Sequence, residues 1–196
     1  MITRQNLENK IKGLGGVKPN PLCPSVDKQI DDVNNFEELE KKFSCKLPEF
    51  YKQLYKSYGP FAFNEKIKCL DIQSNLTVYV DYFYSIDPKT KCSIHALLES
   101  HSDLVTQNLF PISDGELGDL ICIALDVKNY GKIFYWYHER NDGDNLVLLA
   151  ESLEQFIMKL EIEKEDSINE DIDKIKVKAT PEFLEMLRKS GYGPKK

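Results

Sequence analysis

The sequence predicts one domain built from both helices and strands, and three observations support this prediction. Early stretches of the chain repeat apolar residues at the three- and four-residue spacing of helices. Later stretches are rich in β-branched and aromatic residues and are separated by turn residues, as is typical of strands. Hydrophobic residues make up 41% of the 196 residues, which is enough for a buried core and argues against wholesale disorder.

The first part of the chain is predicted to be helical. Residues 1–25 form an arm in which a short helix from Thr3 to Lys12 precedes a loop rich in glycine and proline. A capping-box pattern at 35–38 opens the amphipathic helix FEELEKKF. The next helix begins at Pro48 and ends at Gly59, and its aromatic stripe is expected to pack in the core.

Strands are predicted to follow at residues 67–72, 76–84, 120–125, 132–138 and 145–150. The third of these, LICIAL, is apolar on both faces, so we expect a central strand that is covered on both sides. The residues VKNYG connect it to the fourth strand as a hairpin.

Two more helices are predicted beside these strands. One covers Ser93 to His101, and Ser152 caps the other, SLEQFIMKL, which ends the domain at residue 160. The domain therefore spans residues 26–160. Residues 161–196 are predicted to be a charged extension with a final helix, PEFLEMLRKS.

One segment carries the whole net charge of −6. Residues 111–155 hold nine acids and three bases, whereas the rest of the chain holds 23 of each. Such an acidic field repels nucleic acid and attracts basic partners, so direct nucleic-acid binding is not expected. A solvated acidic rim that only aids solubility is the alternative.

The five cysteines are predicted to be reduced and mostly buried, because their number is odd and no two form a CxxC pair. No apolar run approaches the roughly 20 residues that span a bilayer. The N-terminus lacks the apolar region of a signal peptide. We therefore expect a cytoplasmic protein without a membrane segment.

No catalytic, cofactor-binding or metal-binding motif is found in the sequence. The three histidines lack the i, i+4 spacing of a metal-binding pair. Glu116 and Asp119 lie three residues apart, as do Glu139 and Asp142, and either pair is open to a reading as the acid and base of a hydrolase. A binding role is favoured, so we predict no enzyme, no cofactor and no metal.

Four stretches, in order along residues 30–160, resemble the SUKH superfamily (the Smi/Knr family). The stretch FEELEKKFSCKLPEFYKQLYKSYG resembles its N-terminal signature, and FPISDGELGDLICIAL resembles its "pIg…gGD.icldl" segment. The stretch IFYWYHE is similar to its "vyyWdHe" strand, and AESLEQFIMKL is similar to its closing helix. The chain departs from the pattern at Leu117, which replaces the first of two glycines, and at 58–60, which replace Asn-Gly-Gly.

The resemblance implies an α+β fold, with a mainly antiparallel sheet of about five or six strands flanked by helices. Bacterial members of the family are mostly immunity proteins that neutralise a cognate toxin. Fungal members are scaffold-like regulators of cell-wall synthesis, and neither branch is known for catalysis.

The favoured hypothesis is a bacterial immunity protein whose acidic face occludes a basic toxin domain, such as a nuclease. The alternative is a scaffold or regulatory interaction module. The sequence does not determine the oligomeric state, or whether Trp136 belongs to the core or to the interface. Aromatic residues beside acids and an arginine are typical of interface hot spots. The predicted contact residues are Glu116, Asp119, Trp136, His138, Glu139, Arg140 and Asp142.

Overall fold

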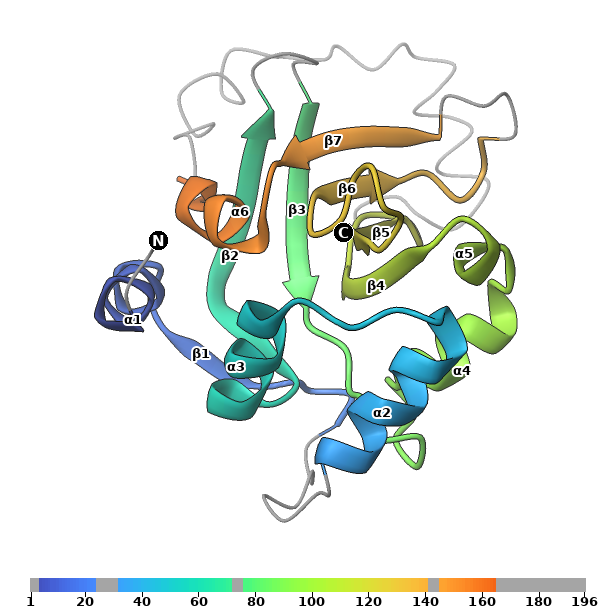
Figure 1. Cartoon of the computed structure of the whole chain (residues 1–196). Coiled ribbons are helices and arrows are strands. Elements are labelled where there is room, and N and C mark those ends of the chain that lie inside the picture. Colours follow the sequence, from blue (N-terminus) through green and yellow to red (C-terminus); the bar gives the residue numbers. More distant parts are fainter. Residues whose placement is uncertain (1–3, 24–31, 72–75, 141–144, 165–196) are drawn as a thin grey trace, which may run out of the picture. The chain divides into compact units, whose positions relative to one another are not determined.

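The computed structural model describes residues 4–23, 32–71, 76–140 and 145–164 (Figure 1). The elements below lie in one compact unit that ends at Glu163. The final helix predicted in the charged extension lies outside the described residues. The helices are α1 (Arg4–Gly13), α2 (Asp32–Phe43), α3 (Glu49–Tyr58), α4 (Ile94–Ser100), α5 (Asp103–Thr106) and α6 (Leu153–Lys159).

The described strands form two antiparallel sheets of four strands each. In the first sheet, β2 pairs with β1, β3 and β8, and the second sheet has the order β4-β5-β6-β7. A bridge between Phe83 and Ser113 connects the two sheets. The strands are β1 (Val17–Pro19), β2 (Phe61–Asp71), β3 (Leu76–Tyr82), β4 (Leu109–Asp114), β5 (Leu120–Ala124), β6 (Ile133–Trp136), β7 (Leu146–Ala150) and β8 (Glu161–Ile162).

The predicted α+β class with antiparallel strands is confirmed, but the strands divide between two sheets. Three strands, β1, β4 and β8, were not predicted from the sequence. Pro19 of β1 lies in the part of the arm that was predicted to be a loop, and β4 contains Pro111. Both prolines lie in strands at the edge of a sheet, which is where proline is tolerated because its missing N–H faces away from the ladder.

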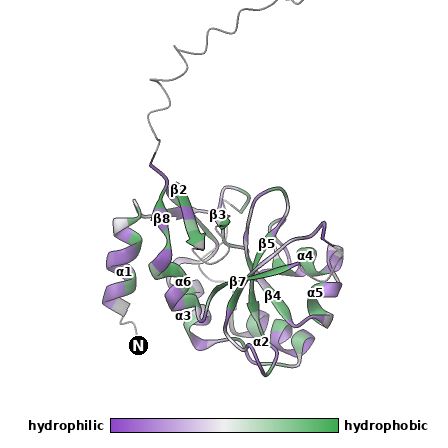
Figure 2. Ribbon diagram, turned by 90° about the horizontal axis from the view of Figure 1, so that it is seen from above, coloured by the Kyte–Doolittle hydropathy of each residue, from purple (hydrophilic) through white to green (hydrophobic). Residues whose placement is uncertain are grey.

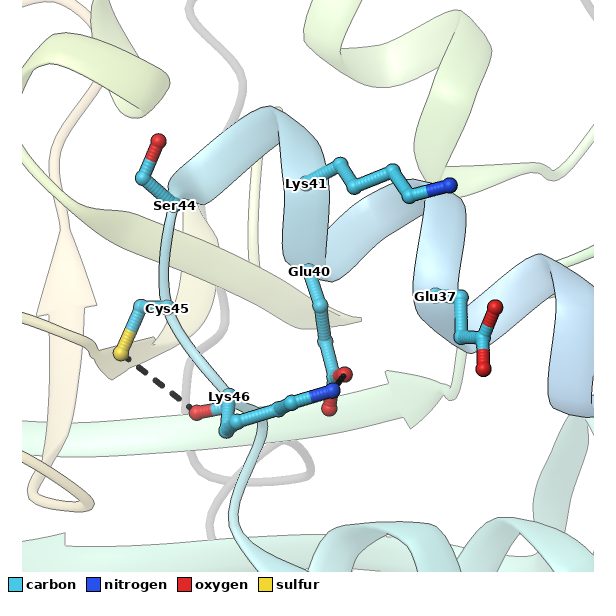
Figure 3. A pocket seen from close by; sticks show the side chains of 6 residues that line it. All are labelled: Glu37, Glu40, Lys41, Ser44, Cys45 and Lys46. Atoms are coloured by element: carbon cyan, nitrogen blue, oxygen red, sulfur yellow. Dashed lines mark hydrogen bonds and ion pairs between the residues drawn. The ribbon is translucent and has the colours of Figure 1, made fainter.

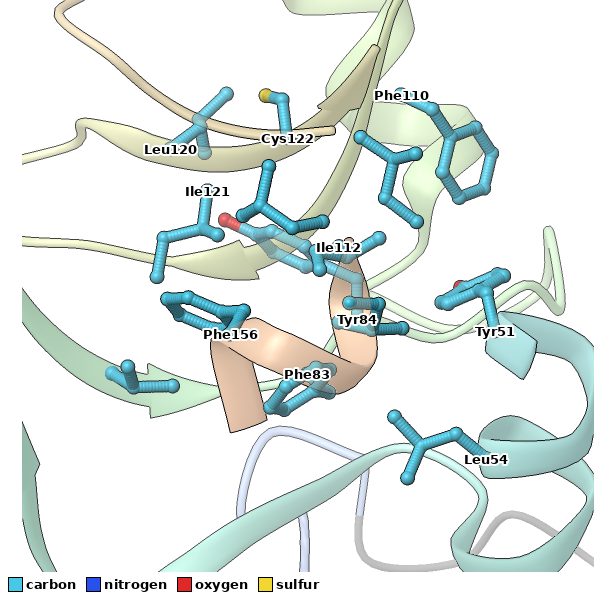
Figure 4. Packing of buried hydrophobic residues seen from close by; sticks show 14 of the residues in the cluster. Tyr51, Leu54, Phe83, Tyr84, Phe110, Ile112, Leu120, Ile121, Cys122 and Phe156 are labelled. Atoms are coloured by element: carbon cyan, nitrogen blue, oxygen red, sulfur yellow. The ribbon is translucent and has the colours of Figure 1, made fainter. Parts of the chain in front are cut away.

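The core is built around β5, whose five residues are all buried, as the apolar run predicted. Figure 4 shows Phe156 of α6 and Leu54 of α3 in the same cluster as Ile112 and Ile121 of the second sheet. Tyr51 of α3 packs its ring edge against Phe110 of β4, with the ring centroids 5.3 Å apart. Helices therefore pack against the second sheet and cover its central strand.

The helix termini follow the signals in the sequence. Pro48 and Gly59 flank α3, and the glycine has a φ of 66°, which glycine adopts without strain. Ser93 and Ser152 accept hydrogen bonds from backbone N–H groups in the first turns of α4 and α6. One prediction was wrong, since α2 begins at Asp32 and not at the capping-box pattern of 35–38.

The N-terminal arm packs against the rest of this unit. Leu7, Ile11 and Leu14 are buried, and both views place α1 beside α6 (Figures 1 and 2). The side-chain amide of Asn20, which is fully buried, donates to the Phe83 carbonyl at 3.0 Å. The arm therefore contributes apolar and polar contacts to the folded unit.

A disulfide joins Cys23 to Cys92, with their Cα atoms 6.4 Å apart. This corrects the expectation that all five cysteines are reduced. The partners are 69 residues apart, so only the tertiary structure brings them together. Cys45 is partly exposed, and Cys69 and Cys122 are buried thiols. None of the described helices is long and apolar enough to cross a membrane.

Candidate protein-binding face

The turn between β4 and β5 is the centre of the candidate face. The Gly115 N–H donates to the Asp119 carbonyl at 2.8 Å, and the Asp119 N–H donates to the Glu116 carbonyl at 3.0 Å. A Cβ atom on Gly115 would lie 2.8 Å from the ring of Tyr135. Glycine is therefore required here, because the turn packs directly against this tyrosine.

Asp119 connects this turn to the end of β6. Its Oδ1 atom accepts the backbone N–H of His138 at 3.1 Å and lies 2.9 Å from the Nδ1 atom of the same residue. The Asp119 side chain is only 15% exposed. This carboxylate therefore holds the turn and the strand end together, which is a positioning role.

Aromatic rings lie beside the turn. The rings of Tyr135 and Tyr137 meet edge to face, 4.9 Å apart, and the guanidinium of Arg140 lies 4.1 Å from the Tyr137 ring centroid. Burial, together with the neighbouring Asp119, raises the pKa of Tyr135 well above its ordinary value. Its phenol oxygen accepts a hydrogen bond from the Glu116 N–H at 3.4 Å, which ties the ring to the turn.

Asp114 adds a half-buried carboxylate that the sequence did not single out. The hydroxyl of Tyr84 donates to its Oδ1 atom at 2.8 Å. Burial raises the pKa of Asp114, and hydrogen bonds from Tyr84 and Tyr82 lower it only in part. Burial and Asp114 also raise the pKa of Tyr82 to about 12. Tyr82 and Tyr84 are two residues apart in the predicted strand 76–84, a spacing that places both on one face of a strand. Their contact with Asp114 is seen only in the structure, because Asp114 belongs to the other sheet.

The first sheet extends the face. Lys66 Nζ lies 2.6 Å from Glu163 and 4.2 Å from the ring centroid of Tyr79, whose hydroxyl donates to the same carboxylate. Glu116 is close enough to contribute to the raised pKa values of Lys66 and Tyr79. We use the term acidic face for Tyr79, Tyr82, Asp114, Glu116, Leu117, Asp119, Tyr137, His138, Glu139 and Arg140.

Most of the predicted contact residues lie on this face. Glu116, Glu139 and Arg140 are exposed, and His138 is partly exposed. Trp136 is only 3% exposed and packs its ring edge against His101, at a centroid distance of 5.5 Å. The indole therefore belongs to the core, which removes it from the contact set.

Of the two predicted acid–base pairs, only Glu116 and Asp119 lie wholly within the described residues. Asp142 lies outside the described residues. Asp119 is engaged by His138, and Glu116 is exposed to solvent. Among the residues that the structure describes, no three His, Cys, Asp or Glu side chains are grouped to hold a metal ion.

An open hollow lies beside the end of α2 (Figure 3). Its central carboxylate, Glu40, is 6% exposed and accepts hydrogen bonds from Lys46 Nζ at 2.7 Å and from the Leu47 N–H at 3.0 Å. Lys52 Nζ lies 2.5 Å from Oε1, the same oxygen that accepts the Leu47 N–H. These contacts connect α2 to the start of α3. The charged groups that line the hollow therefore have a structural role, and no ligand is needed to explain them. The lining residues are Glu37, Glu40, Lys41, Ser44, Cys45 and Lys46.

A comparison with known protein families gives a match that includes this face. Residues 32–159 match the SMI1 / KNR4 family (SUKH-1). The chain belongs to this family. The match begins at the start of α2 and ends with α6, so it contains both the hollow and the turn at the centre of the acidic face. In this SUKH-1 protein, α1 and β1 precede the matched range and β8 follows it.

A curated relative of this SUKH-1 protein is known from Bacillus subtilis (strain 168). It carries the description "SPbeta prophage-derived uncharacterized protein YokK". The two sequences are 28% identical over 159 residues, which cover 70% of this chain and 81% of the relative. The similarity therefore extends over most of both chains.

Proposed function

We propose that this SUKH-1 protein is an immunity protein that binds a cognate toxin domain and neutralises it by occlusion. Membership of the family supports this role. The observation that carries the proposal is the gathering of carboxylates and tyrosines on the acidic face. These groups come from both sheets, and Glu116 and Glu139 among them are exposed to solvent.

The chemistry of the face favours a basic partner. Glu116 and Glu139 are exposed, and the charge imbalance of the whole chain lies in the segment that contains them. Complementary charge accelerates encounter and disfavours wrong partners. Tyrosines such as Tyr137 add rigid contact area at a low cost in conformational entropy. A nuclease domain fits this description, because it needs a basic surface to bind phosphates.

The test is a binding titration with the toxin domain encoded beside this chain, produced as a catalytically inactive variant. We expect the double reversal Glu116→Lys and Glu139→Lys to weaken binding at least tenfold, mainly at low salt. The matched control reverses Glu37 and Glu99, which are exposed on α2 and α4 and change the net charge equally.

Two outcomes would contradict the proposal. One is that the wild-type protein does not bind the toxin domain. The other is that both double variants bind equally well, which would reduce the acidic face to a solubilising rim. A scaffold role would be indicated by several weak partners in place of one stoichiometric complex.

A further inference from the structure

Leu117 lies at the tip of the turn between β4 and β5, where its exposure and its backbone conformation are both unfavourable for the free energy of folding. Its side chain is 95% exposed. Its backbone has a φ of 56°, in the left-handed region where a residue with a Cβ atom loses about 1–2 kcal/mol. Glycine or asparagine would suit the turn better, because both adopt this conformation more readily. The local fold therefore does not explain a leucine at this position.

The surroundings of Leu117 are charged. Glu116 precedes it and is exposed, and the side chain of Glu139 is 86% exposed. The ring of His138 lies beneath Gly118, 3.4 Å from where a Cβ atom would stand. The leucine therefore projects from a positioned turn, and the carboxylates of Glu116 and Glu139 are among its exposed neighbours.

We propose that Leu117 is the apolar anchor of the interface and inserts into an apolar pocket on the toxin domain. Lysine or arginine residues at the rim of that pocket pair with Glu116 and Glu139. This inference rests on the proposed function. An apolar centre surrounded by a polar rim is the arrangement that concentrates binding energy in protein interfaces. Carboxylates on the rim repel anionic lipid and nucleic acid, which favours a basic protein as the occupant.

Val127 provides a matched control on the neighbouring β5–β6 hairpin. It lies on the loop between β5 and β6, is fully exposed, and is absent from the described non-glycine residues with positive φ. Because β5 separates this loop from the turn that holds Leu117, the two apolar side chains lie at opposite ends of one strand. Replacing Val127 removes an exposed apolar side chain without touching the acidic face.

The experiment is a calorimetric titration of the inactive toxin domain with four proteins. We expect Leu117→Asn to weaken binding at least tenfold, and we expect the conservative Leu117→Met to stay within about threefold of wild type. Val127→Asn should bind like wild type. The unfolding midpoint of Leu117→Asn should equal or exceed that of wild type, because asparagine tolerates the left-handed backbone.

The results separate this inference from the proposed function. Wild-type binding with an affinity that Leu117→Asn leaves within twofold would overturn the anchor and leave the immunity role standing. Equal losses in Leu117→Asn and Val127→Asn would also overturn it, because the effect would then not be specific to the tip. A wild-type protein that does not bind the toxin domain would remove both proposals together.

Discussion

Near one end of β5 a carboxylate is buried and hydrogen-bonded within the chain, whereas near the other end a carboxylate is exposed to solvent. Beyond one end, the hydroxyl of Tyr130 in the β5–β6 loop donates to the Lys46 carbonyl, beside the buried carboxylate of Glu40. Glu40 accepts hydrogen bonds from a lysine and a backbone N–H and pairs with a second lysine. At the other end, Glu116 and Leu117 are exposed on a turn that is itself tightly hydrogen-bonded.

This difference separates stability from binding. Removing one partner of a buried charge pair destabilises the fold, because the other charge is left buried and unpaired. Exposed carboxylates contribute little to stability. Their value, and that of an exposed leucine, lies in what they contact in a partner. The predictions below test this separation.

The largest effect on stability is expected at Glu40, whose carboxylate is hydrogen-bonded within the chain. Glu40→Gln should lower the free energy of unfolding by about 2–3 kcal/mol, because hydrogen bonds from charged donors are lost. Burial alone would raise the pKa of Glu40. Hydrogen bonds from Lys46, Lys52 and Leu47 outweigh burial and hold the pKa below its ordinary value of 4.5. The contribution of its charge is therefore complete above pH 4.5 and is lost as the pH falls through the folded-state pKa.

Urea denaturation of wild type and Glu40→Gln between pH 7 and pH 3 measures this effect. The gap between the two proteins should narrow in acid, while toxin binding at pH 7 stays unchanged. The exposed neighbour Glu37, changed to Gln, is the control and should shift stability by less than about 0.5 kcal/mol. A gap that stays constant with pH would contradict the role given to the charge.

An intermediate effect on stability is expected at Asp119, which also positions the turn proposed to bind the toxin domain. Asp119→Ala removes two interactions with His138 and should cost about 1–2 kcal/mol of stability. It should also weaken toxin binding, because the turn loses its connection to β6. Comparing Asp119→Ala with His138→Ala by both denaturation and titration tests the connection. Full retention of binding in both variants would show that the turn holds its shape without it.

The smallest effect on stability is expected at Asp114, where replacement should stabilise the protein at pH 7. Its pKa in the folded state is raised above 3.8, so its contribution to stability is present below pH 3.8 and is lost as the pH rises through the folded-state value. Asp114→Asn should therefore unfold at a slightly higher temperature than wild type at pH 7, with the difference vanishing in acid. Thermal melts at the two pH values measure this. A variant that is less stable at pH 7 would place Asp114 with Glu40 as a stabilising charge.

Several parts of the site were visible in the sequence, and others were not. The acids of 111–155 stood out by counting, and the predicted set included Glu116, Glu139 and Arg140, which the structure places on the acidic face. The contact of Tyr82 with Asp114 was not predicted, because these residues lie in different sheets, which meet at the bridge between Phe83 and Ser113. The sequence left open whether Trp136 is core or interface, since alternation along a strand does not say which face is covered.

The sequence by itself determined the local elements of this protein. Proline before α3, glycine after it, and the serines before α4 and α6 act within one turn of chain, so their effects can be read directly. The all-apolar run of β5 likewise required a covered strand. Only the tertiary structure decided the division into two sheets, the disulfide between Cys23 and Cys92 and the grouping of the acidic face. These features depend on contacts between residues far apart in sequence, which local periodicity does not encode.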